Sequence, residues 1–153
     1  MNKTKLINWL PALIWMIIIF LFSAQPASDS NQLSVGFTKV LIDAFGKVLL
    51  FDIEISTIND IGVQLNHIIR KLAHFIVYLI LGILVSRALI KEGFKERVFL
   101  ISVLICGIYA ASDELHQLFV PGRGCQLRDV IIDSSGSLVG IAINKFFMSR
   151  LRY

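Results

Sequence analysis

The stretch from Lys71 to Ile90, KLAHFIVYLILGILVSRALI, decides the fold class of this chain. Apolar residues run through it over about 20 positions, which is the length that an α-helix needs to cross a bilayer. Lys71, His74 and Tyr78 follow one another at steps of three and four, so they share one face of that helix. Because ionisable groups beside hydrocarbon are costly, the stretch predicts a membrane helix whose polar face is paired, hydrated or used.

The rest of the chain repeats this pattern of long apolar blocks. The 153 residues are 56% hydrophobic, and the mean hydropathy is +0.73. Four blocks approach spanning length, at about 6–22, 72–90, 98–118 and 130–147. We therefore expect an all-α membrane protein that forms a single domain over residues 1–153, a bundle of four transmembrane helices. The first block resembles a signal peptide, but the residues at 23–26 make a poor cleavage site, so we expect a retained anchor.

The distribution of charge predicts the orientation in the membrane. The amino terminus, the 87–97 loop and the carboxy-terminal tail hold nine of the 15 Lys and Arg but only two of the 11 acidic residues. Basic loops stay on the cytoplasmic side, so we expect both termini there. The net charge of +4 then reports topology and not nucleic-acid binding. The expected location is the cell membrane, with several passes.

The cysteines and the outer segment each carry a pattern that predicts structure. Cys106 falls in the middle of the third span and Cys125 in an outer loop, so we expect no disulfide between them. In the outer segment, residues 23–71, apolar side chains recur at helical spacing at Phe37, Val40, Leu41, Ala44, Phe45, Val48 and Leu49. This predicts an amphipathic helix that lies either on the outer leaflet or across the top of the bundle. From Asn59 or Asp60, one helix is expected to continue into the second span.

Polar stripes also mark the third and fourth spans. Tyr109, Asp113, His116 and Gln117 share a face, with Glu114 about 100° away. The fourth span carries Asp129, Asp133, Gly136, Ser137, Gly140 and Asn144 on one face. Gly82 and Ser86 continue the polar stripe of the second span and should let another helix approach closely. Gly136 and Gly140 form a GxxxG step in the fourth span, which is a weak signal on its own. Because hydrocarbon excludes such groups, the stripes are expected to face inward together.

A turn brings the polar groups of the last two spans to one depth. Residues 121–124, Pro-Gly-Arg-Gly, form a tight turn that returns the chain toward the third span. An outward-facing pocket is therefore expected from Lys71, His74, Asp113, Glu114, Arg123, Asp129 and Asp133. Lys71 and Arg123 suit an anionic head group, and His74 or His116 suits proton transfer. Alternatively, the groups only neutralise one another at helix ends and hold the bundle together. A divalent cation on the carboxylates is a weaker hypothesis, because no known ligand spacing supports it.

These residues also resemble a known family. KLAHFIVY, YAASDELHQLFVPGRGCQLRDVIIDSSGSLVG and the earlier FSAQPASDS together resemble the VanZ-like family of bacterial membrane proteins. The resemblance covers most of the chain and implies several helical spans and, for the founding members, lowered susceptibility to teicoplanin. It marks Lys71, His74, Tyr78, Asp113, Glu114, Gln117, Arg123, Asp129, Asp133 and Gly136. The resistance-associated branch has an Asn and a Pro-Gly pair where this chain has Lys71 and His74, so the phenotype transfers less securely than the fold.

Three functions fit these observations. The leading hypothesis is a membrane enzyme that hydrolyses or transfers groups on a lipid-linked anionic envelope precursor or phospholipid. In it we assign acid-base or orienting roles to His74, Asp113, Glu114 and His116, and head-group binding to Lys71, Tyr78, Gln117, Arg123, Asp129 and Asp133. The alternative is a non-catalytic protein that binds or shields a lipid-linked cell-wall precursor or docks a membrane partner. A small transporter is the third, and four spans would require oligomers for it.

Overall fold

A computed structural model describes residues 3–32, 35–36, 40, 55–94 and 97–150. Its long helices are α1 (Lys3–Ser23), α3 (Ile55–Lys91), α4 (Val98–Gln117) and α5 (Leu127–Arg150). No strand occurs in this described part of the chain. The prediction of an all-α protein is confirmed, since four helices are long and apolar enough to cross a membrane.

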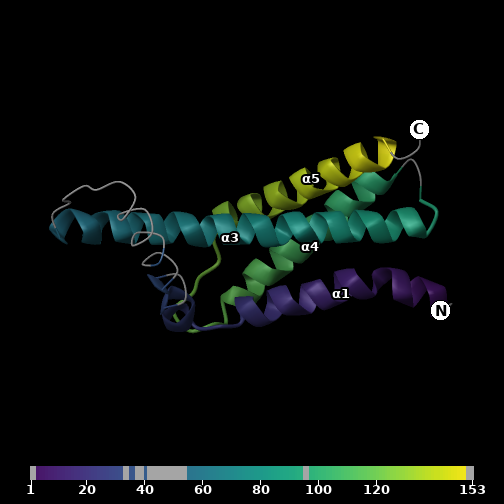
Figure 1. Cartoon of the computed structure of the whole chain (residues 1–153). Coiled ribbons are helices and arrows are strands. Elements are labelled where there is room, and N and C mark those ends of the chain that lie inside the picture. Colours follow the sequence, from purple (N-terminus) through teal and green to yellow (C-terminus); the bar gives the residue numbers. More distant parts are fainter. Residues whose placement is uncertain (1–2, 33–34, 37–39, 41–54, 95–96, 151–153) are drawn as a thin grey trace.

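The helices run in alternating directions through the bundle. In Figure 1, α3 and α5 run side by side in the same direction, and α4 crosses α3 obliquely between α5 and α1. The first residues of α1 and the last residues of α5 lie at the same end of the bundle, together with the carboxyl end of α3 (Figure 1). An even number of spans has this consequence, and it fits the prediction that both termini share one side of the membrane.

The observed spans match the predicted blocks to within a few residues. The apolar helical segments are Lys5–Ser23, His67–Lys91, Val98–Gln117 and Leu127–Arg150. With 37 residues, α3 is roughly 55 Å long, well beyond the ~30 Å of a hydrocarbon core. Its amino-terminal turns therefore extend past the other helices (Figure 1). The prediction of one helix running into the second span is confirmed, and it begins at Ile55, before the expected cap.

Small residues bring α3 and α5 into backbone contact. A Cβ added to Gly136 or Gly140 would overlap the carbonyl oxygen of Phe75 or Leu79, respectively, on α3. A Cβ added to Gly82 of α3 would overlap the carbonyl oxygen of Ser137 on α5 in the same way. These contacts confirm the predicted close approach, and we call them the glycine seam. One turn beyond Gly140 on α5, the Asn144 amide donates a hydrogen bond of 2.9 Å to Ser86 Oγ on α3.

Apolar side chains fill the bundle and also cover its outside. The buried core includes Ala12, Ile19, Tyr78, Leu81, Val85, Leu89, Cys106 and Ala110. Many large apolar side chains remain exposed along the helices, among them Ile17, Leu100, Leu104 and Ile108. In a soluble protein such a surface would be an aggregation hazard. On helices of spanning length it is the surface that contacts lipid.

The outer segment is described only in part. The predicted amphipathic helix lies largely outside the described residues. Residues 27–32 are helical, and the Ala27 amide donates a 3.1 Å hydrogen bond to the Pro121 carbonyl. That bond ties the segment after α1 to the turn between α4 and α5. Gly122 in this turn has a φ of 74°, a conformation that favours glycine, so the predicted tight turn is confirmed.

The two cysteines are not joined. Cys106 is buried within α4, whereas Cys125 is exposed just before α5. Both are free thiols, as the sequence pattern predicted.

Candidate functional site

Two adjoining cavities lie near the end of the bundle that holds the α4–α5 turn. The larger has a volume of about 310 Å³ and is mostly apolar. Its wall is formed by Ile19, Phe22, Ser23, Gln25, Ser30, Ile69, Arg70, Ala73, His74, Val77, Tyr78, Asp113 and Arg123. The smaller has a volume of about 110 Å³ and is mainly polar. Its wall is formed by Ala27, Arg70, Lys71, His74, Gln117, Gly122, Arg123, Gly124, Gln126 and Asp129.

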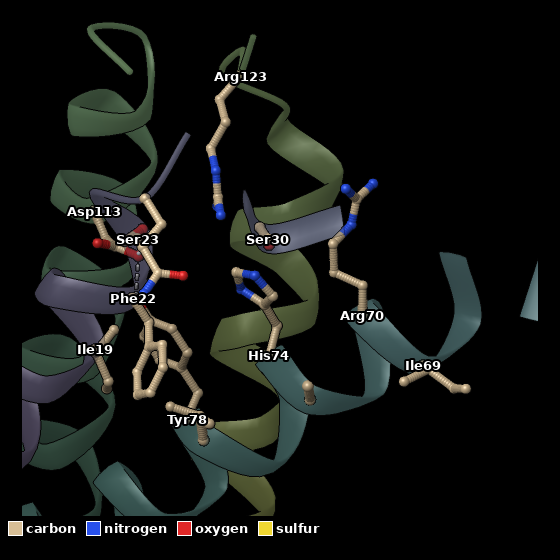
Figure 2. A pocket seen from close by; sticks show the side chains of 13 residues that line it. Ile19, Phe22, Ser23, Ser30, Ile69, Arg70, His74, Tyr78, Asp113 and Arg123 are labelled. Atoms are coloured by element: carbon tan, nitrogen blue, oxygen red, sulfur yellow. Dashed lines mark hydrogen bonds between the residues drawn. The ribbon is translucent and has the colours of Figure 1, made fainter. Parts of the chain in front are cut away.

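Three cationic or titratable side chains belong to both walls: Arg70, His74 and Arg123. Arg70 and His74 stand one turn apart on α3, while Arg123 reaches in from the α4–α5 turn. Figure 2 shows the Arg123 side chain pointing from the turn toward His74, with Arg70 to one side. The junction between the cavities is thus rich in positive charge and hydrogen-bond donors.

The two guanidinium groups have neutral partners. Arg70 Nη1 donates to Asn31 Oδ1 at 3.0 Å, and Arg123 Nη1 donates a long hydrogen bond of 3.4 Å to Gln117 Oε1. Among the described residues, neither guanidinium forms a salt bridge with a carboxylate. Burial, and then the positive charge of Arg70, lower the pKa of Arg123. It stays protonated near neutral pH because an arginine begins from a very high pKa, so the site presents two like charges that an anion would stabilise.

A buried carboxylate stands behind His74. Asp133 is 1% exposed, and its Oδ1 lies 3.5 Å from His74 Nδ1. Neither oxygen of Asp133 has a hydrogen-bond partner among the described residues. A protonated imidazole would form an ion pair at this distance, so the carboxylate is placed to stabilise the charged form of His74.

A second buried carboxylate, Asp113, is the centre of a hydrogen-bond network. Its Oδ2 accepts hydrogen bonds from Ser23 Oγ at 2.9 Å and from the Tyr78 hydroxyl at 3.2 Å. Gln117 Nε2 donates to Ser23 Oγ at 2.8 Å and so connects the network to Arg123. Asp113 Oδ1 is buried without a partner among the described residues. The network joins α1, α3, α4 and the turn around the cavities.

The remaining pair on the polar wall is Lys71 with Asp129. Their side chains form a salt bridge between α3 and the first turn of α5, and each is about one-fifth exposed. Partial exposure allows water or a polar ligand to reach the pair. These two residues therefore neutralise each other, as the alternative interpretation of the polar groups predicted for all of them.

Glu114 and His116 do not belong to either wall. Glu114 is 1% exposed, and its Oε1 accepts a 2.6 Å hydrogen bond from the Gln126 amide at the start of α5. The carboxylate thus caps the amino terminus of α5, where the helix dipole stabilises a negative charge. The His116 ring packs against Phe20 with 4.5 Å between ring centroids, and its buried Nε2 lacks a partner among the described residues. The acid-base roles predicted for these two residues gain no support from their positions.

Two members of the site, Ser23 and Arg70, are not among the residues predicted from the sequence. Arg70 precedes His74 by four residues, so helical spacing alone placed both on one face. Ser23 ends α1, and its role depends on α1 meeting α4, which no local pattern reveals. Both are polar residues at the ends of apolar blocks, and that position was the available signal.

A divalent cation on the carboxylates is the weaker of the hypotheses drawn from the sequence. Among the residues with described side chains, no group of three or more His, Cys, Asp or Glu is arranged to hold a metal ion. The groups that the two cavity walls share are two guanidinium groups and one imidazole.

Three comparisons with known proteins test which family the chain belongs to. Neither the curated proteins nor the solved structures gave a match. A family model described as VanZ/LLP1 matches residues 8–148, which include all four long helices almost completely and both cavities. This agrees with the resemblance seen in the sequence motifs. The chain is therefore a multi-pass membrane protein that belongs to the VanZ/LLP1 family.

Proposed function

We propose that this VanZ/LLP1 protein is a membrane enzyme that acts on the anionic head group of a lipid-linked substrate, by hydrolysis or group transfer. The observation that carries the proposal is the meeting of two guanidinium groups and one imidazole where a polar cavity adjoins an apolar one. The charge distribution supports an outward-facing site, since the opposite end of the bundle carries most of the basic loops. An envelope precursor or a phospholipid has the required chemistry.

Head-group binding would rest on Arg70 and Arg123. Guanidinium groups match the geometry of phosphate and carboxylate oxygens and can bind them with two parallel hydrogen bonds. Their present partners, Asn31 and Gln117, are neutral amides. An incoming anion would therefore displace hydrogen bonds to neutral groups and, among the described residues, would break no salt bridge. Lys71 contributes further positive charge, but Asp129 already pairs with it.

His74 is the acid-base group of the proposal. Its Nδ1 faces Asp133, which leaves Nε2 as the atom that exchanges a proton with the substrate or with water. In hydrolysis, Nε2 accepts a proton as water attacks the head group and later returns one to the leaving oxygen. Asp133 stabilises the imidazolium between these steps. The arginines stabilise negative charge as it develops on the head group.

Asp113 has a positioning role in this scheme. Ser23 and Tyr78 hold one of its oxygens, so the carboxylate cannot rotate freely. Through Gln117, the same network reaches the Arg123 side chain. Loss of Asp113 would loosen the arginine that binds the head group.

The test measures binding and turnover separately. Wild-type protein in nanodiscs would be incubated with phosphatidate, lysophosphatidate and polyprenyl phosphates or diphosphates, with products followed by mass spectrometry and binding by native mass spectrometry. His74→Asn should reduce turnover at least a hundredfold with binding retained. Arg123→Gln should weaken binding at least tenfold. His67→Asn on α3 and Arg128→Gln on α5 are matched controls, because neither residue belongs to the wall of either of these two cavities.

The outcomes separate the two main hypotheses. Turnover that depends on His74 supports the enzyme. Binding that depends on Arg123, with no turnover of any lipid, favours the shielding protein. Equal binding by wild type and Arg123→Gln would refute the head-group site itself. If the substrate is a cell-wall precursor, teicoplanin susceptibility of cells with and without the protein is a further readout.

A further inference from the structure

The larger, apolar cavity has no part in binding or reacting with the head group in the proposed function. It lies between α1 and α3, with Ile19 and Phe22 on one side and Ile69, Ala73 and Val77 on the other. Figure 2 shows the Arg123 side chain toward one end and Ile19 and Tyr78 toward the other, with His74 between them. A ligand that fills both cavities must therefore be charged at one end and apolar at the other.

The surroundings of this cavity connect it to the membrane. Phe22 is 58% exposed and Ala73 is also exposed, so the described residues leave the α1–α3 side of the cavity open. These residues belong to the spanning segments Lys5–Ser23 and His67–Lys91, close to their outer ends. A hydrocarbon chain can thus pass from the bilayer into the cavity without crossing water.

The polar groups at the inner wall of the cavity are already satisfied in part. Tyr78 is fully buried and donates its hydroxyl to Asp113, which also accepts from Ser23. An alkyl chain beside this wall would take no hydrogen bond away from them. The volume of about 310 Å³ is at the low end for ligand pockets, which suits one chain segment and not two.

We infer that the α1–α3 cavity holds a single hydrocarbon chain of a lipid phosphate whose head group lies at Arg70, His74 and Arg123, and that Ala73 determines whether the chain fits. The inference rests on the proposed function and specifies its substrate as a single-chain amphiphile. The bilayer is as apolar as the cavity, so the chain gains little from the transfer itself. Its contribution is to orient the head group against His74, which is where binding in a fixed geometry assists reaction.

The experiment fills the cavity without touching the charged groups. Ala73→Phe places a ring in the chain site, and Ile76→Phe, on the exposed face of α3 outside the cavity wall, is the matched control. Binding of oleoyl lysophosphatidate, farnesyl phosphate, dioleoyl phosphatidate and the chainless glycerol 3-phosphate would be measured on purified protein. Ile69→Trp is the second variant in case Ala73→Phe does not fold. Thermal unfolding of each variant identifies misfolded protein.

We expect Ala73→Phe to lose at least tenfold in affinity for the single-chain phosphates. Ile76→Phe should bind those phosphates with wild-type affinity, and Ala73→Phe should bind glycerol 3-phosphate as the wild type does. Comparing the oleoyl and farnesyl ligands shows whether the chain is acyl or prenyl. Wild-type affinity for oleoyl lysophosphatidate in folded Ala73→Phe and Ile69→Trp would overturn the chain site. Tighter binding of the two-chain phosphatidate would overturn the single-chain assignment. Neither result would contradict the head-group site. The head-group site itself fails only if Arg123→Gln binds the lipid phosphates as tightly as the wild type.

Discussion

Substitution of Gly140 by alanine tests whether the glycine seam sets the distance between the two halves of the site. The added Cβ would overlap the Leu79 carbonyl oxygen and would lie 2.9 Å from its carbon and 3.2 Å from the Ile83 nitrogen. All three atoms are backbone, so no side chain can turn aside. The closest of these contacts is the overlap with the carbonyl oxygen, so α3 and α5 must separate by roughly 1 Å or more to reach ordinary contact distances.

The expected cost follows from this separation. Overpacking of a tight contact costs about 1–3 kcal/mol, and the better helix propensity of alanine returns up to about 1 kcal/mol. An overlap with backbone atoms belongs in the upper part of that range, about 2–3 kcal/mol. The net destabilisation is therefore about 1–2 kcal/mol, which for a chain of this size lowers Tm by roughly 2–8 °C. The seam also joins the helices that carry His74 and Asp133, 3.5 Å apart. A displacement near an ångström at this pair can reduce turnover by up to about a hundredfold.

Gly107→Ala provides the matched control. Gly107 lies on α4, and a Cβ there would meet nothing within 4 Å. It should therefore leave Tm unchanged or raise it by a few degrees, roughly in line with helix propensity. Both variants would be melted in the same detergent and in nanodiscs. Equal Tm values for Gly140→Ala and Gly107→Ala would show that the seam does not constrain the bundle.

Three further predictions concern stability and topology. Lys71→Met leaves Asp129 without its cation, so this single variant should be less stable than the double variant Lys71→Met with Asp129→Asn. A double-mutant cycle on unfolding free energies should give a coupling of about 0.5–3 kcal/mol, and additive effects would contradict the ion pair. Glu114→Ala should cost about 1–3 kcal/mol because the amide at the start of α5 loses its acceptor, whereas an unchanged Tm would mean that water replaces the carboxylate. A membrane-impermeant maleimide should label exposed Cys125 on intact cells and spare buried Cys106; Cys125→Ser is the control, and labelling only after lysis would place the α4–α5 turn inside the cell.

Most of the fold was predictable because the bilayer imposes one dominant constraint. Backbone polar groups in hydrocarbon must bond within the segment, so each long apolar block had to be a helix. The parallel approach of α3 and α5 was also foreseeable, since Gly136 and Gly140 stand one turn apart on a face with other small residues. The oblique crossing of α4 had no such local signal, because it depends on how side chains from three helices pack together.

The site was predictable as a set of residues more than as a geometry. His74, Asp113 and Arg123 were chosen as candidates because they are polar groups beside hydrocarbon, and all three line a cavity. His116 has the same sequence signal, yet its ring packs on Phe20 outside both cavity walls. Residues one step apart on a helix differ by about 100° in direction, so a small rotation of α4 decides which of them faces inward.

Sequence alone determined that this chain crosses a membrane four times and gathers its ionisable groups near one end of the bundle, because the cost of burying polar groups in hydrocarbon acts on every residue locally. Tertiary structure decided which of those groups meet. Arg70 and Arg123 share a cavity junction, Ser23 reaches Asp113 across 90 positions of the chain, and Glu114 holds the start of α5 instead of facing the cavities. These contacts depend on the rotation and crossing of whole helices, and that is a property of the packed bundle.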